Sequence, residues 1–161
     1  MTSKIIDLDQ VAAQTRELRA AGRKLVVTNG CFDLLHVGHV RYLQAARALG
    51  DVLLVGINGD RSIRELKGPD RPINSENDRA EVVAALACVD LVIIFPEVRA
   101  VRLLENAAPA VYAKGGDYTV ATLNPEERAI LEKLGAEIRI IPFEKGYSTS
   151  GLLQKLNRLR E

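Results

Sequence analysis

The sequence of 161 residues is 47% hydrophobic and 27% charged, which is the composition of an ordinary globular protein. Its 22 basic and 21 acidic residues give a net charge of +1, which argues against a nucleic-acid-binding or membrane-surface protein. The 2 cysteines, Cys31 and Cys88, lack the spacing of a disulfide framework or a cysteine zinc site. No apolar stretch is long enough for a signal peptide or a membrane span, and we expect one cytoplasmic domain over residues 1–161.

Short β-branched runs alternate with helical patterns along the chain. A leading helix is expected over residues 8–21, in a segment (1–22) that leads into the first strand. The expected strands cover residues 24–28, 52–57, 91–95, 110–113 and 137–141, and the later helices cover residues 40–49, 76–87, 98–106, 125–134 and 150–160. Near-continuous apolar strands separated by helices predict an α/β fold with one open, parallel, Rossmann-like sheet and helices on both faces.

Glycine, serine and proline residues at the ends of these elements agree with this fold. Gly22, Gly50 and Gly135 each follow a helical stretch and precede a strand, so we expect them to cap the C-termini of helices. Ser75 is expected to cap the helix that follows it, and Pro125 suits a first helical turn. Ligands of such sheets bind beyond the carboxyl ends of the strands, where the strand order reverses. The residues just after each strand are therefore the candidates for a functional site.

The first strand runs into the segment TNGCFDLLHVGH (residues 28–39), which carries both histidines of the chain. It contains neither the GxGxxG of dinucleotide-binding proteins nor the GxxxxGK[ST] of P-loop proteins. His36 and His39 are expected to point to one side of a helix start, where free N–H groups and the helix dipole favour an anion. Gly38 would let a phosphate approach the backbone. Two alternatives are histidines that only satisfy local backbone groups and a zinc site, for which no third ligand is apparent.

The segment GCFDLLHVGH resembles the signature of the HxGH nucleotidyltransferase superfamily. The resemblance extends over residues 24–156, and the stretches VVTNGCFDLLHVGHVRYLQAARALGD, LKGPDRPIN, KGGDY and GYSTSGLLQKL are most similar to the heptose 1-phosphate adenylyltransferase branch. Related glycerol-phosphate cytidylyltransferases have an arginine at the place of Phe143, which weakens that assignment, although Lys145 could substitute in part. The resemblance implies a homodimer or higher homo-oligomer, and a separate chain for the heptose kinase that is often fused to this domain.

The resemblance implies that the catalytic residues are His36, His39, Lys67 and Arg79. Lys67 and Arg71 lie in an expected loop stiffened by prolines, and they would place two cations over a triphosphate. A solvated basic loop is the alternative. Arg79 lies in the first turn of an expected helix, where a cation is unfavourable unless an anion is near. A local ion pair, for example with Asp78, is the alternative for Arg79.

The loop KGGDY after the fourth strand is assigned to the acceptor substrate. Lys114 would bind a sugar phosphate, and Asp117 can accept hydrogen bonds from hydroxyl groups. The alternative for this loop is a plain turn, and Tyr118 can be explained equally well as a packing residue. Asp33 is explained more readily as structural, holding its loop through backbone N–H groups, than as a catalytic group. The expected acceptor-binding residues are Asp33, Arg71, Lys114, Gly115, Gly116 and Asp117.

The nucleotide is expected to contact the segments after the first two strands and before the last helix. Hydroxyl groups at a helix N-terminus combine capping with anion binding, and simple capping is the alternative for them. The expected nucleotide-binding residues are Asn29, Gly30, Cys31, Phe32, Gly38, Asn58, Asp60, Ser148, Thr149 and Ser150. Mg²⁺ is expected to arrive with ATP, and no resident metal site is predicted.

The resemblance predicts transfer of AMP from ATP to D-glycero-β-D-manno-heptose 1-phosphate, which gives pyrophosphate and ADP-heptose, a precursor of lipopolysaccharide. A phosphate monoester is already a nucleophile at neutral pH, so the reaction needs positioning and electrostatic stabilisation and no strong base. One alternative is another acceptor, such as glycerol 3-phosphate, an aminoalcohol phosphate or flavin mononucleotide, with CTP or ATP. The other is a nucleotide-binding module without turnover.

Overall fold

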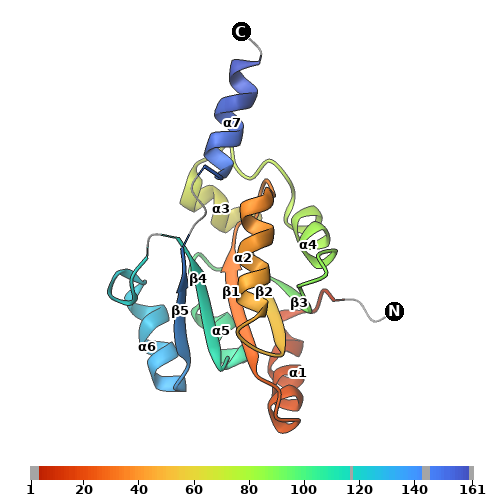
Figure 1. Cartoon of the computed structure of the whole chain (residues 1–161), viewed down its shortest axis with the longest axis vertical. Coiled ribbons are helices and arrows are strands. Elements are labelled where there is room, and N and C mark those ends of the chain that lie inside the picture. Colours follow the sequence, from red (N-terminus) through yellow and green to blue (C-terminus); the bar gives the residue numbers. More distant parts are fainter. Residues whose placement is uncertain (1–3, 117, 143–145, 160–161) are drawn as a thin grey trace.

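A computed structural model describes residues 4–116, 118–142 and 146–159. Its centre is a sheet of five parallel strands in the order β3-β2-β1-β4-β5, and the sheet is open (Figure 1). The strands are β1 (Leu25–Gly30), β2 (Val52–Asn58), β3 (Leu91–Phe95), β4 (Val111–Gly115) and β5 (Glu137–Ile141). The predicted open parallel α/β sheet is therefore confirmed, and β1 runs two residues beyond its predicted end.

Helices cover both faces of the sheet. On one face lie α1 (Leu8–Ala20), α5 (Val101–Ala107) and α6 (Pro125–Leu134), and on the other α2 (Val37–Arg47) and α4 (Glu76–Ala84). Successive strand residues point to opposite faces, so Leu25 and Val27 join the first core while Val26 joins the second. The complete burial of β2 and of the first four residues of β1 explains their near-continuous apolar runs, whereas β5 at the edge of the sheet is partly exposed.

The structure confirms some of the predicted helix caps and contradicts one. Gly22 and Gly135 have φ of 70° and 68°, the left-handed conformation that glycine adopts easily after a helix. Gly50 is not in that conformation, and the prediction that it caps α2 is wrong. A Cβ on Gly50 would lie 2.6 Å from the backbone oxygen of Lys24, so its small size serves close packing against β1. Ser75 caps α4 by accepting a hydrogen bond from the Asp78 N–H, as predicted.

The sequence pattern missed one helix, α3 (Asp60–Lys67). This helix has 8 residues, of which only Ile63 and Leu66 are apolar, so it is too short and too polar for its pattern to stand out in the sequence. The predicted ends of α2, α4 and α5 also shift by a few residues, because helix boundaries depend on local capping.

The last helix, α7 (Thr149–Arg158), projects from the carboxyl edge of the sheet, away from α1 at the opposite edge (Figure 1). A short helix, η1 (Val120–Thr122), precedes α6. Among the described residues, no helix combines the length and the apolar character needed to cross a membrane.

Candidate active site

A groove of about 290 Å³ opens at the carboxyl ends of β1 and β4. From β1 the chain passes to β2 on one side, whereas β4 pairs with β1 on the other, so this is the point where strand order reverses. The groove is lined by Asn29, Gly30, Cys31, Phe32, Asp33, His39, Tyr42, Lys67, Arg71, Lys114, Gly115, Tyr118 and Thr149. Eleven of these thirteen were predicted as site residues from the sequence, and they come from four segments that are distant along the chain.

His36 and His39, here called the histidine pair, stack at the start of α2. Their ring centroids are 3.9 Å apart and the rings are inclined by 27°. His36 is the N-cap residue of α2, with extended backbone, and its side chain does not cap the helix. The Nδ1 atoms of both rings are buried without a hydrogen-bond partner among the described residues. Buried polar atoms are normally paired. Protein atoms cover these two nitrogens, so a ligand would contact the rings at Nε2 instead.

Burial keeps both rings of the histidine pair neutral. It lowers the pKa of His36 below its usual value of 6.5. Burial, with smaller contributions from His36 and Lys67, lowers the pKa of His39 to about 4. A neutral imidazole offers one N–H donor and one acceptor nitrogen, so each ring can donate one hydrogen bond to a phosphate oxygen.

The Phe32 ring packs against the histidine pair. Its ring centroid is 5.4 Å from that of His39, and its backbone φ is 47°, in the left-handed region that a non-glycine residue rarely adopts. A Cβ on Gly30 would lie 2.9 Å from the Phe32 ring, so the glycine leaves room for this packing. The strained residue is therefore held beneath His39 by close contacts on both sides.

Gly38 allows close packing at the start of α2 and also lines open space. A Cβ there would lie 3.0 Å from the His36 ring and 3.0 Å from the Tyr147 Cβ, so a larger residue would press on both. Beside it lies a hollow of about 200 Å³ with apolar walls from Ile141, Pro142 and Tyr147. The hollow shares His39 and Tyr42 with the groove, so the two are neighbours.

Two lysines face the groove from opposite sides. Lys67, at the end of α3 and not in the predicted loop, has no ion-pair partner among the described residues. Lys114 donates a hydrogen bond of 3.3 Å to the Tyr112 hydroxyl, which lies 2.6 Å from the Asn29 Oδ1. This chain of hydrogen bonds leaves the Asn29 amide nitrogen as a free donor at the end of β1. Burial lowers the pKa of Lys114, and the neighbouring Glu127 opposes that shift.

Asp33 holds the loop between α3 and α4. Its carboxylate accepts hydrogen bonds from the N–H groups of Ile73 and Asn74 and lies 2.7 Å from both Nε and Nη2 of Arg71. Burial raises the pKa of this carboxyl, but these hydrogen bonds and Arg71 outweigh it and hold the pKa below its usual value. The structural role considered for Asp33 is thus what the contacts describe. Arg71 still lines the groove, and its buried Nη2 has no well-aligned acceptor among the described residues.

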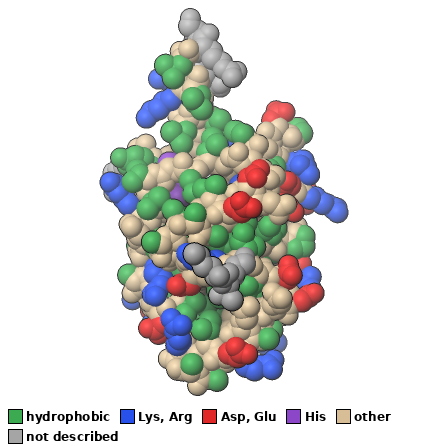
Figure 2. Space-filling view, turned by 90° about the vertical axis from the view of Figure 1, so that its right-hand side faces the viewer, with side chains coloured by type: hydrophobic (Ala, Val, Ile, Leu, Met, Phe, Trp, Pro, Cys, Tyr) green, Lys and Arg blue, Asp and Glu red, His purple; other side chains and the backbone are tan. Residues whose placement is uncertain are grey.

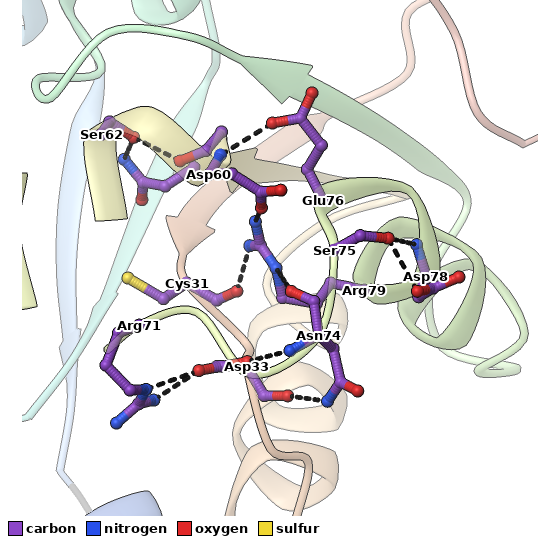
Figure 3. A network of polar contacts seen from close by, with 12 residues as sticks. Cys31, Asp33, Asp60, Ser62, Arg71, Asn74, Ser75, Glu76, Asp78 and Arg79 are labelled. Carbon is purple, nitrogen blue, oxygen red and sulfur yellow. Dashed lines mark hydrogen bonds and ion pairs between the residues drawn. The ribbon is translucent and has the colours of Figure 1, made fainter. Parts of the chain in front are cut away.

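Arg79 is placed differently from the expectation that it faces phosphates. Its side chain is 1% exposed, and its guanidinium donates to the carbonyl oxygens of Cys31 and Asn74 and to the Asp60 carboxylate, at 3.0 Å or less (Figure 3). The Cys31 carbonyl faces Arg79, while its thiol points the other way (Figure 3). We call these contacts the arginine network. Asp60 of α3 is the ion-pair partner of Arg79, because the fold packs α3 against the first turn of α4.

The remaining predicted residues lie around this centre. Asn58 lines a neighbouring chamber, and Ser148 caps α7 by accepting a hydrogen bond from the Gly151 N–H. Gly115 lines the groove, and a Cβ there would lie 2.9 Å from the Tyr42 ring, while Gly116 has a φ of 125°. Ser150 is exposed, and Asp117, Phe143 and Lys145 lie outside the described residues.

Charges of both signs intermix on the face drawn in Figure 2, and the histidine pair shows only as a small surface among hydrophobic side chains. That face carries no broad basic area of the kind that binds nucleic acid.

Residues 27–155 match the family described as cytidylyltransferase-like. The chain belongs to this nucleotidyltransferase family. Among curated relatives, this cytidylyltransferase-like chain is 47% identical over 154 residues to the bifunctional protein HldE of Geotalea uraniireducens and 47% identical over 155 residues to that of Helicobacter pylori. Each alignment covers 96% of this chain but only 31% and 32% of the relative, so the chain spans about a third of the length of these proteins.

Solved structures agree with the family. The lipopolysaccharide core biosynthesis protein from Thermoplasma volcanium is 31% identical, with a TM-score of 0.63 over 79% of this chain and 100% of that one. The pantoate-beta-alanine ligase from Francisella tularensis, at 15% identity and a TM-score of 0.58 over 98% of this chain and 79% of that one, shares the fold alone.

Several residues of this cytidylyltransferase-like site escaped the sequence analysis. Tyr42 bonds to the Thr28 hydroxyl and the Ala113 carbonyl, and Tyr112 positions Asn29 and Lys114. Both tyrosines follow the apolar pattern of their elements, so nothing local distinguishes them from core residues. Tyr118 packs over Lys114, whose Nζ is 5.5 Å from the ring centroid. These side chains gain a role only through contacts between segments.

The described residues offer few side-chain ligands for a metal ion. The described residues contain no group of three or more histidine, cysteine, aspartate or glutamate side chains that could hold an ion. Mg²⁺ is commonly bound largely by substrate phosphates and water, with few protein ligands, and that mode of binding fits these residues.

Proposed function

We propose that this chain transfers AMP from ATP to D-glycero-β-D-manno-heptose 1-phosphate, giving ADP-heptose and pyrophosphate. The observation that carries the proposal is the stacked histidine pair at the start of α2, beside a groove lined by two lysines. The acceptor rests on the similarity to the bifunctional protein HldE over 96% of this chain and on the sequence motifs KGGDY and GYSTSGLLQKL.

In the proposed reaction, the triphosphate lies along the groove with its α-phosphate beside the histidine pair. An oxygen of the acceptor phosphate attacks the α-phosphorus, and the bond to the bridging oxygen of the β-phosphate breaks. Pyrophosphate leaves with that electron pair, so no proton transfer is required. The imidazole N–H groups stabilise the charge that grows on the α-phosphate oxygens, and they are effective because they are already desolvated and fixed.

The two lysines have separate tasks in this proposal. Lys67 is exposed and unpaired among the described residues, so it can follow the β- and γ-phosphates as pyrophosphate departs. Lys114 is fixed by Tyr112 and is suited to the acceptor phosphate. Mg²⁺ bound to the triphosphate would neutralise charge on the leaving group.

The apolar hollow beside the histidine pair is suited to the nucleoside. Its walls of Ile141, Pro142 and Tyr147 offer apolar surface and a ring for a base to stack on. We further propose that the protein works in the cytoplasm as a homodimer or higher homo-oligomer. A kinase acting on the anomeric hydroxyl of the sugar is its expected pathway neighbour.

The proposal is tested by pyrophosphate release with Mg²⁺, crossing ATP, CTP and GTP against heptose 1-phosphate, glycerol 3-phosphate and flavin mononucleotide. Release confined to ATP with heptose 1-phosphate is the expected result. Release with another pair would retain nucleotidyl transfer and reject this acceptor or base. Binding of ATP without release from any pair would favour a module without turnover.

A further inference from the structure

A chamber of about 480 Å³ adjoins the groove on the side of β4 and α6. Groove and chamber share six lining residues, so they lie side by side: Asn29, Gly30, Cys31, Lys67, Lys114 and Tyr118. The far wall comes from the loop after β3 and from the segment between η1 and α6, to which neither the sequence motifs nor the reaction above gives a role. Its volume is within the usual range of small-molecule sites.

Glu127 is the acidic group of this far wall. It lies in the first turn of α6 and is only 5% exposed. Its Oε1 accepts a hydrogen bond of 2.9 Å from the Ala100 N–H, and no other donor to its carboxylate is found among the described residues. A carboxylate can accept about four hydrogen bonds, so Oε2 retains acceptor capacity at the chamber wall. The N-terminus of α6 and the nearby Lys114 offset the charge of this carboxylate, and Oε2 can still accept hydrogen bonds from hydroxyl groups of a ligand.

The cations near Glu127 do not occupy the free hydrogen-bonding position of its Oε2. Lys114 interacts with Glu127 electrostatically, yet the two do not form an ion pair within 4.0 Å in the described structure. Arg99 also lines the chamber, is exposed, and forms no ion pair with a described residue. An acceptor oxygen at one position and unpaired cations at others match a ligand that has several hydroxyl groups and a negative charge.

We propose that Glu127 is the specificity-determining residue for the acceptor, and that its free carboxylate oxygen accepts hydrogen bonds from hydroxyl groups of a polyhydroxylated sugar phosphate. The inference rests on the proposed function and deepens it, because it states how the site distinguishes a sugar phosphate from a short acyclic phosphate. The acceptor phosphate lies in the groove near Lys114, and the sugar ring fills the chamber toward Arg99 and Glu127. A site built to bind hydroxyl groups discriminates strongly against a substrate that lacks them.

The test is the variant Glu127→Gln. The Ala100 N–H requires an oxygen at Oε1, so the glutamine keeps that hydrogen bond and presents NH₂, a donor, where Oε2 was an acceptor. We expect kcat/KM for heptose 1-phosphate to fall about 10- to 100-fold, the effect of losing a hydrogen bond to a charged group. The KM for ATP and the urea midpoint of unfolding should stay close to wild type. Glu126→Gln, at the exposed neighbouring position, is the matched control and should behave as wild type.

Other results would overturn the inference. Unchanged kcat/KM in Glu127→Gln, or an equal loss with sugar and acyclic acceptors, would show that Glu127 does not read the sugar. If the variant is destabilised, Arg99→Met replaces it, with an expected rise of about tenfold in the KM for heptose 1-phosphate alone. If wild type itself releases no pyrophosphate with any sugar 1-phosphate, the proposed function fails first, and this inference fails with it.

Discussion

The histidine pair and the arginine network lie at the same edge of the sheet, but they differ in whether their buried polar atoms have hydrogen-bond partners. Both imidazoles keep a buried nitrogen without a partner, whereas the Arg79 guanidinium donates to two carbonyl oxygens and a carboxylate. Unsatisfied buried polar atoms are unfavourable in the absence of a ligand, whereas a satisfied set stabilises the fold. The comparison separates residues that contact substrate from residues that position them.

Arg79→Met gives the largest expected effect and tests the scaffold side of the comparison. Removing one partner from a buried ion pair leaves Asp60 and two carbonyl oxygens uncompensated, so we expect a loss of about 3–5 kcal/mol in the free energy of unfolding. Urea denaturation measures this. Arg128→Met, which removes an exposed pair with Glu132, is the control and should change stability by less than about 1 kcal/mol. A stable Arg79→Met protein that has lost ATP binding would instead make Arg79 a phosphate ligand.

His39→Ala tests the ligand side. We expect kcat to fall about 10²- to 10³-fold, which is typical when one fixed donor to a developing anion is removed, with little change in the urea midpoint. Steady-state pyrophosphate release measures kcat, and His36→Ala should behave in the same way. Turnover close to that of wild type in either variant would contradict the catalytic role assigned to the histidine pair.

Lys67→Met sharpens the comparison with a smaller effect. The unpaired ammonium contributes to phosphate binding and little to the fold, so we expect kcat/KM for ATP to drop about 10- to 100-fold at unchanged stability. Arg61→Met serves as the control on the same helix, because Arg61 is exposed and pairs only with Glu65. An equal loss in both variants would point to a general effect of charge on α3.

The last prediction concerns the pH dependence of stability, where the effect is spread over a range of pH. Folded His39 has a pKa of about 4, against 6.5 for an ordinary histidine, so the unfolded chain binds the proton more readily. Stability contributed by neutral His39 is therefore complete above about pH 6.5 and is lost as the pH falls toward 4. Urea titrations of wild type and His39→Gln across this range should show a steeper loss for wild type. Parallel curves would mean that His39 is not desolvated in the folded protein.

The sequence predicted the site better than the roles within it. The strand ends and motifs named most of the groove, because parallel strands bring their carboxyl ends to one edge whatever the details of packing. The assignment of Arg79 to phosphates came from its place in a first helical turn. That argument could not include Asp60, since α3 is too short and too polar to be recognised in the sequence.

By itself, the sequence determined the parallel α/β sheet, the position of the histidine pair and the membership in a nucleotidyltransferase family. Those features depend on local periodicity and on motifs of adjacent residues, which a linear reading records. Only the tertiary structure decided which charges stay free, such as Lys67, and which are used up inside the protein, such as Arg79 and Asp33. It also brought Glu127 of α6 to the chamber beside the groove. Hydrogen-bond satisfaction and burial depend on contacts between segments that are distant along the chain.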